Sequence, residues 1–136
     1  MPNEIFDRTL IVAENDPMMR GLLRSILEAP RRTLLLCADG QEAVELARQT
    51  LVDLVLLDLR MPRMDGIEAC AQIRALPRHE TVPIVVLTVF DGDVPKQKAL
   101  RAGATAFLAK PFSRAQLLRT IDPLMAAYRP GRVSHY

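Results

Sequence analysis

Polar side chains that suit metal and phosphate chemistry stand directly after four apolar runs of this chain. They comprise carboxylates, an amide, a hydroxyl and an amine: Glu14, Asn15, Asp16, Asp58, Thr88 and Lys110. Carboxylate and amide oxygens suit a hard divalent cation such as Mg²⁺, which keeps several of its waters. A lysine and a hydroxyl can bind phosphoryl oxygens, and an aspartate can be the nucleophile that forms an aspartyl phosphate. Asp58 is the best placed nucleophile, because it stands at the tip of an apolar run.

Five apolar runs are the elements that must position these groups. Each is of strand length, and they cover residues 10–13, 34–37, 54–57, 84–87 and 106–109. Because the runs are continuous and do not alternate with polar residues, they predict strands buried on both faces, as in a parallel sheet covered by helices.

Helical patterns occupy the stretches between and after these runs. They begin near Pro17, Gly40, Gly66, Val94 and Leu117. Strands that alternate with helices predict a doubly wound α/β fold with right-handed crossovers. In such a fold ligands bind at the carboxyl ends of the strands, so we expect the polar groups to meet at one edge of the sheet.

The composition predicts one globular domain. Of 136 residues, 49% are hydrophobic and 25% charged, which allows a sizeable core. The net charge of +2 and the absence of Trp argue against direct nucleic-acid binding. No apolar run has the length of a membrane span and the N-terminus lacks a secretory signal, so we expect no membrane contact and a cytoplasmic location. Cys37 and Cys70 lack metal-ligand spacing and are predicted to be buried, reduced thiols.

Four segments in combination give the chain a family resemblance. They are Glu14-Asn15-Asp16-Pro17, the stretch LLDLRMPRMDG at residues 56–66, Leu87-Thr88 and Lys110-Pro111-Phe112. Together they resemble the receiver domain of two-component response regulators. The resemblance covers about residues 7–127, so we expect a receiver domain over 1–127 and an exposed tail or linker stump over 128–136.

The resemblance implies a fold, a reaction and a role for each residue. The fold is flavodoxin-like, a five-stranded parallel sheet of order 2-1-3-4-5 with helices on both faces. The reaction is transfer of a phosphoryl group from a sensor histidine kinase to Asp58. By the same resemblance Glu14, Asn15, Asp58 and the Arg60 backbone carbonyl bind Mg²⁺, whereas no other cofactor is implied.

Further roles follow from the same resemblance. Thr88 and Lys110 hold the phosphoryl oxygens, and the Lys110-Pro111 peptide is expected to be cis. Phe107 matches the aromatic residue whose rotamer follows Thr88, although an aromatic in an apolar strand is equally consistent with a plain core residue. The surface of the fourth helix, fifth strand and fifth helix would report the phosphorylation state.

Two residues depart from the family pattern. Asn15 replaces a carboxylate, so residues 14, 15 and 58 carry a formal charge of −2 instead of −3 and weaker Mg²⁺ binding is expected. Asp16 either compensates by turning inward or is simply the N-cap of the following helix. Val89 follows Thr88 where the family more often has a small residue, and is expected to slow access of small phosphodonors.

The expected partners are a sensor histidine kinase or phosphotransfer protein, a downstream effector or output domain, and a second copy of the chain in a homodimer. No enzymatic activity beyond self-catalysed phosphorylation and dephosphorylation is implied.

The alternative is a degenerate receiver that acts as a phosphorylation-independent interaction module. A dehalogenase-type phosphatase would need an acid at Arg60, and a flavin-binding protein would need a phosphate-cradling loop in place of Glu14-Asn15-Asp16.

Three further polar residues are given ordinary roles. Asp53 is interpreted as a turn residue outside the site. His79 lies in a polar stretch and His135 in the tail; neither has a partner that suggests catalysis, and both are predicted to be solvated.

Overall fold

The computed structural model describes residues 7–89 and 92–128, and strands and helices alternate throughout them. The elements are β1 (Arg8–Ala13), α1 (Pro17–Leu27), β2 (Arg32–Cys37), α2 (Gly40–Gln49), β3 (Leu54–Asp58), α3 (Gly66–Arg74), β4 (Ile84–Thr88), α4 (Asp93–Arg101), β5 (Ala106–Ala109) and α5 (Arg114–Ala127). Each predicted strand and helix is present, including the weakly patterned helix that begins near residue 93. Most of the predicted tail lies outside the described residues.

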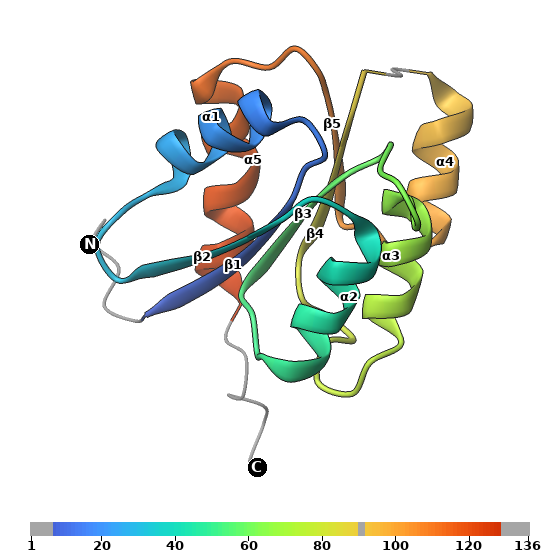
Figure 1. The fold of residues 1–136 in the computed structure, drawn as a ribbon, viewed down its shortest axis with the longest axis horizontal. Helices are drawn as coiled ribbons and strands as arrows, with labels where there is room; N and C mark the ends of the chain where they lie inside the picture. Colours follow the sequence, from blue (N-terminus) through green and yellow to red (C-terminus); the bar gives the residue numbers. More distant parts are fainter. Residues whose placement is uncertain (1–6, 90–91, 129–136) are drawn as a thin grey trace.

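The sheet is parallel throughout and has the strand order β2-β1-β3-β4-β5. Helices α1 and α5 cover one face, and α2, α3 and α4 cover the other (Figure 1). The doubly wound fold of order 2-1-3-4-5 is therefore confirmed.

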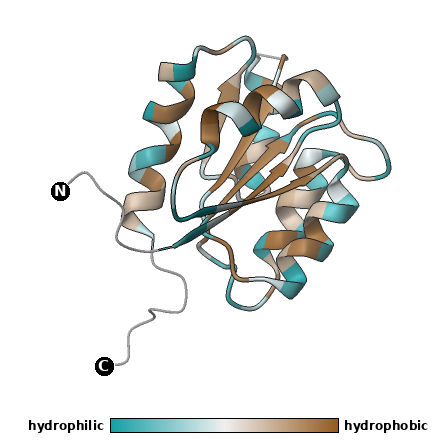
Figure 2. Cartoon of the chain, turned by 60° about the vertical axis from the view of Figure 1, so that its left-hand side comes forward, coloured by the Kyte–Doolittle hydropathy of each residue, from teal (hydrophilic) through white to brown (hydrophobic). Residues whose placement is uncertain are grey.

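Two apolar cores lie on opposite faces of the sheet. Successive side chains of β1 alternate between them, since Leu10 and Val12 pack with α1 and α5, whereas Ile11 and Ala13 pack with α2 and α3. Strands β3 and β4 are buried along their whole length, so their residues before Asp58 and Thr88 are all apolar. In Figure 2 the strands are mostly brown (hydrophobic), whereas the helices carry both brown and teal (hydrophilic) residues.

Most helices begin at a side-chain cap. The capping residues are Asp16 of α1, Asp39 of α2, Asp65 of α3 and Ser113 of α5. Helix α4 differs, because its N-cap is Gly92 and no side chain bonds to its first turn. Among the described residues, Ala99 is the one buried residue of α4, whereas each of the other four helices buries at least three.

Two polar residues have structural roles that differ from the sequence predictions. His79 is predicted to be solvated but is 2% exposed, and its Nε2 lies 2.8 Å from the Ala47 carbonyl oxygen. Asp53 is more than a turn residue: it accepts hydrogen bonds from Arg8 Nη1 at 3.1 Å and from the Thr9 amide at 2.8 Å. His135 lies outside the described residues.

The two cysteines are buried free thiols, as predicted. Burial raises the pKa of Cys37 to about 12 and that of Cys70 to about 11. Both therefore stay protonated near neutral pH, where the thiol is a poor nucleophile and a poor metal ligand.

Candidate functional site

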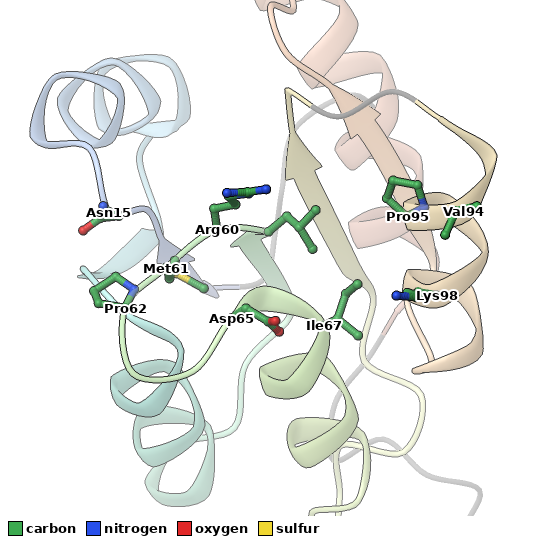
Figure 3. A pocket seen from close by; sticks show the side chains of 10 residues that line it. Asn15, Arg60, Met61, Pro62, Asp65, Ile67, Val94, Pro95 and Lys98 are labelled. Atoms are coloured by element: carbon green, nitrogen blue, oxygen red, sulfur yellow. The ribbon is translucent and has the colours of Figure 1, made fainter.

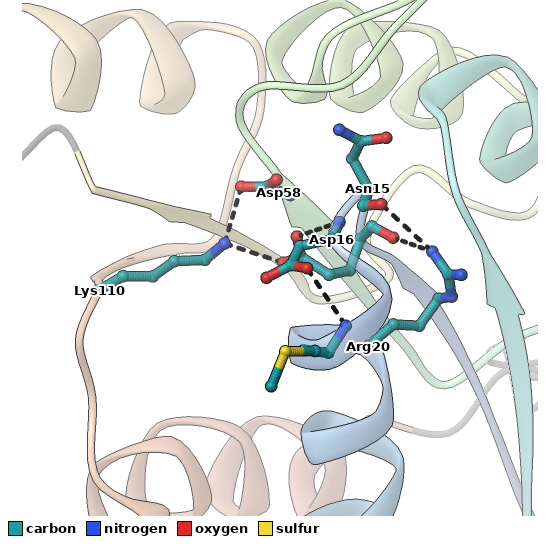
Figure 4. A network of polar contacts seen from close by, with 7 residues as sticks. Asn15, Asp16, Arg20, Asp58 and Lys110 are labelled. Atoms are coloured by element: carbon teal, nitrogen blue, oxygen red, sulfur yellow. Dashed lines mark hydrogen bonds and ion pairs between the residues drawn. The ribbon is translucent and has the colours of Figure 1, made fainter.

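Glu14, Asp58 and Lys110 meet at the carboxyl edge of the sheet. Glu14 directly follows β1, Asp58 ends β3 and Lys110 directly follows β5. The Lys110 Nζ donates to Glu14 Oε1 at 2.9 Å and to Asp58 Oδ1 at 3.2 Å (Figure 4). Parallel strands bring together side chains that are 96 and 52 positions apart in the sequence.

The three side chains form a buried cluster with excess negative charge. Glu14 is 1% exposed and Asp58 is 7% exposed. Burial, followed by repulsion from Glu14, raises the pKa of Asp58 to about 6, although Lys110 acts in the opposite direction. Burial opposes the charge on Lys110, but the hydrogen bond to Glu14 and the charge of Asp58 outweigh it, so the pKa of Lys110 is raised.

Thr88 lies beside this cluster at the end of β4 and is 1% exposed. Its carbonyl oxygen accepts a hydrogen bond of 2.7 Å from the Lys110 amide, which fixes the backbone that carries Lys110. The Lys110-Pro111 peptide is cis, as expected. Val89 follows Thr88 and is 65% exposed, so its side chain lies at the surface.

Phe107 is half-buried on β5, where it pairs in register with Val86. Its ring packs against the core beneath α2, α3 and α4. The structure therefore shows Phe107 on the face of the sheet that α4 covers, and its role as a switch stays a prediction.

The turn between β1 and α1 is held by its own side chains. Glu14 Oε2 accepts from the Asp16 amide at 3.1 Å, and Arg20 Nη1 donates to the Glu14 carbonyl oxygen at 2.7 Å. Asn15 is exposed at the mouth of the site. The Asp16 carboxylate is also exposed and accepts from the Met18 amide at 3.2 Å, so it serves as the N-cap of α1 instead of turning inward.

Replacing Asp16 by Ala is expected to cost about 1 kcal/mol of stability in urea denaturation, because the first turn of α1 loses its cap. Mg²⁺ affinity, measured by calorimetric titration, should change less than twofold, whereas Asp16→Ser should restore stability. A large fall in Mg²⁺ affinity would show that Asp16 coordinates the cation.

The segment between β3 and α3 carries Arg60 and is closely packed. The Gly66 amide donates to the Leu59 carbonyl oxygen at 2.8 Å. A Cβ atom at Gly66 would collide with the Asp58 carbonyl oxygen, so only glycine allows α3 to begin this close to the site. Arg63 of the same segment pairs with Asp39, a contact that no sequence pattern indicated.

A hollow of about 920 Å³ opens between this segment and α4 (Figure 3). Asn15 and Arg60 line one side of the hollow, and Val94, Pro95 and Lys98 line the α4 side. Glu14, Asp58, Thr88 and Lys110 do not line the hollow, which opens beside the segment that follows Asp58.

The oxygen atoms at this edge suit a hard cation. Within residues 7–89 and 92–128, no group of three or more His, Cys, Asp or Glu side chains could hold a metal. The available donors are two carboxylates, the Asn15 amide and the Arg60 carbonyl. Because one lysine faces two buried carboxylates, a divalent cation would relieve the negative charge that raises the pKa of Asp58.

A family model described as "Response regulator receiver domain" matches residues 10–122 of the chain. The chain belongs to this family. The receiver domain is a signalling module of two-component systems, and the resemblance drawn from the four sequence segments is confirmed. Within the described parts of this receiver domain, no helix combines the length and apolar character needed to cross a membrane.

Known proteins share this domain in several contexts. The receiver domain is 36% identical over 123 residues to the signal transduction histidine-protein kinase BarA of Escherichia coli (strain K12), covering 90% of this chain and 13% of BarA. It is 38% identical over 123 residues to the transcriptional regulatory protein PdtaR of Mycobacterium tuberculosis, covering 90% of this chain and 58% of PdtaR. The chain therefore spans only part of these two relatives.

A solved structure shows the same fold with a cation bound. The receiver domain of the sensor histidine kinase PA1611 from Pseudomonas aeruginosa PAO1 superposes with a TM-score of 0.81 and is 32% identical. The match covers 88% of this chain and 98% of the PA1611 domain, whose structure has a magnesium ion coordinated in the active site cleft.

Proposed function

We propose that this receiver domain accepts a phosphoryl group on Asp58 from a phosphohistidine of a sensor histidine kinase or phosphotransfer protein. A carboxylate oxygen of Asp58 forms the new P–O bond while the P–N bond of the phosphohistidine breaks. The electron pair of that bond stays on the imidazole, which takes up a proton. The observation that carries the proposal is the contact of Lys110 with both buried carboxylates at the edge where ligands of this fold bind.

The ionisation of Asp58 supports its role as nucleophile. With a pKa of about 6, Asp58 is largely ionised at pH 7 to 8, yet it is more basic than an ordinary aspartate. The segment that directly follows Asp58 lines an open hollow, so a phosphodonor would approach the carboxylate from this side.

The neighbouring residues would hold the transferred group. Lys110 and Thr88 supply the ammonium and hydroxyl that bind the phosphoryl oxygens. Glu14, Asn15, Asp58 and the Arg60 carbonyl are the residues that would hold Mg²⁺. When bound, the cation neutralises charge on the phosphoryl oxygens.

Phosphorylation would act as a switch by adding a charge of about −1.5 to −2. We expect Thr88 to move toward the new oxygens and Phe107 to enter the space that Thr88 leaves, which changes the surface of α4, β5 and α5. That surface would contact a downstream effector or output domain, or a second copy of the chain. The reaction is self-modification, so the chain is not proposed to turn over a separate substrate.

The proposal is tested by intact mass spectrometry after treatment with acetyl phosphate and Mg²⁺. We expect a mass gain of one phosphoryl group, which Asp58→Asn abolishes and EDTA suppresses. The matched control is Asp122→Asn, because Asp122 is an exposed aspartate on α5, away from the site. A gain that persists in Asp58→Asn would refute the assignment of the phosphoacceptor.

One observation favours a second function. Asn15 places an exposed amide where receiver domains usually have a carboxylate, which lowers the negative charge available for a cation. A degenerate receiver that binds partners without phosphorylation would show no mass gain even at high Mg²⁺. The same mass measurement therefore separates the interaction module from the phosphorylation switch.

A further inference from the structure

An ion pair between Arg63 and Asp39 connects the Arg60-bearing segment to the start of α2. Arg63 donates to Asp39 Oδ2 from Nη2 at 2.6 Å and from Nε at 3.2 Å. The Asp39 side chain is 3% exposed, although the Arg63 side chain is 67% exposed. The other oxygen, Asp39 Oδ1, accepts from the Glu42 amide at 2.8 Å, so one carboxylate caps α2 and also holds the segment.

The backbone around this pair is equally constrained. Arg63 has a φ of 67°, a conformation that non-glycine residues seldom adopt without surrounding support. The Gly40 amide donates to the Met64 carbonyl oxygen at 3.1 Å, and a Cβ atom at Gly40 would collide with that oxygen. The segment from Leu59 to Asp65 is thus fastened to α2 at Arg63 and Met64.

We propose that Arg63 and Asp39 are positioning residues of the phosphoacceptor site, which hold the segment carrying the Arg60 carbonyl in place for the divalent cation. This inference rests on the proposed function, because it concerns the cation that assists phosphorylation of Asp58. Neither residue touches the reacting atoms. Their effect passes through the backbone between Arg60 and Met64.

The direction in which Mg²⁺ affinity changes when Arg63 is replaced distinguishes a positioning role from a purely electrostatic one. Arg63 is a cation, so its removal would strengthen Mg²⁺ binding if only long-range charge mattered. If Arg63 holds the segment, its removal weakens Mg²⁺ binding despite the loss of a repulsive charge. Residues that orient metal ligands typically change metal affinity by about 10-fold to 100-fold when replaced.

The test compares Arg63→Asn with Arg31→Asn in the full chain. Asn tolerates positive φ, so the substitution removes the guanidinium without adding backbone strain. Arg31 is a matched control because it has a φ of 66° and an ion pair with Asp7 at 3.5 Å, but lies between α1 and β2, at the opposite edge of the sheet from Asp58.

The dissociation constant for Mg²⁺ is measured by monitoring a Mg²⁺ titration with ¹H–¹⁵N NMR spectra. NMR is used because the chain has no Trp for a fluorescence titration. We expect Arg63→Asn to raise the dissociation constant about tenfold and Arg31→Asn to leave it unchanged. Asp39→Asn, which keeps a capping oxygen for α2, should produce a similar rise. The double variant should be no worse than either single variant, because both remove the same contact.

An unchanged or lower dissociation constant in Arg63→Asn would overturn the inference, as would additive losses in the double variant. Amide hydrogen exchange of Met64 and Gly66 gives a second measurement that does not depend on Mg²⁺. Faster exchange in Arg63→Asn supports the holding role, whereas unchanged exchange contradicts it. Failure of the unsubstituted chain to bind Mg²⁺ would instead refute the metal assistance in the proposed function and the cation-positioning role with it.

Discussion

Replacing Lys110 by Met is expected to lower the rate of phosphorylation by acetyl phosphate by about 100-fold or more. Met fills a similar volume but removes the ammonium that contacts Asp58 and Glu14 at 3.2 Å and 2.9 Å. The phosphoryl oxygens then lose their positively charged partner. Because Lys110 lowers the pKa of Asp58 in the native chain, the pKa rises further in the variant and less of the nucleophile is ionised at neutral pH.

Quantifying the phosphorylated fraction by intact mass at several times gives the rate. Lys96→Met is the matched control, since Lys96 is an exposed lysine of α4 that does not line the cleft. The Lys110→Met rate should recover in part as the pH is raised from 7 to 9, because the remaining Asp58 ionises. A rate close to that of the native chain would show that Lys110 does not bind the transferring group.

Asp58→Asn is expected to stabilise the fold at pH 8 by up to about 3 kcal/mol. The pKa of Asp58 is raised from 3.8 to about 6, so the folded state disfavours its ionised form. Between these two values the folded state binds more protons than the unfolded state, and native stability falls as the pH rises. The penalty is complete above about pH 6 and absent below about pH 4. Asn removes the charge and with it the penalty.

Urea denaturation from pH 4 to 8 measures this difference. The gain from Asp58→Asn should grow through the range from pH 4 to 6 and then level off. Asp53→Asn is the control, and it is expected to lower the stability of the fold by about 3 kcal/mol. The reason is that the buried Asp53 carboxylate is paired with Arg8 at 3.1 Å, and the substitution leaves the buried Arg8 charge without this partner. If Asp58→Asn were destabilising at pH 8, the Asp58 charge would be favourable in the folded state.

Much of the fold follows from short patterns in the sequence. Four consecutive buried apolar residues in both β3 and β4 form continuous apolar runs, which identify strands covered on two faces. Capping residues such as Asp16 and Ser113 mark the helix starts. The meeting of Glu14, Asp58 and Lys110 also follows, because parallel topology sends every strand end to the same edge.

Other features depend on packing that no local pattern records. The Arg63–Asp39 pair joins residues 24 positions apart, and the Arg8–Asp53 pair joins residues 45 positions apart. Whether such residues meet depends on the lengths and conformations of the loops that carry them, which short sequence patterns do not record. The burial of His79 has the same origin, since this residue lies between α3 and β4 and the carbonyl oxygen that it approaches belongs to helix α2.

The shallow attachment of α4 has a consequence for how a signal could leave the domain. Since only Ala99 of this helix is buried and Gly92 provides no side-chain cap, displacing α4 would sacrifice little apolar contact and no side-chain capping bond at its N-terminus. The remaining helices each bury three or more side chains. In the proposed switch, α4 is therefore the helix whose movement would disturb the least packing, and both hydrophobic layers would keep theirs.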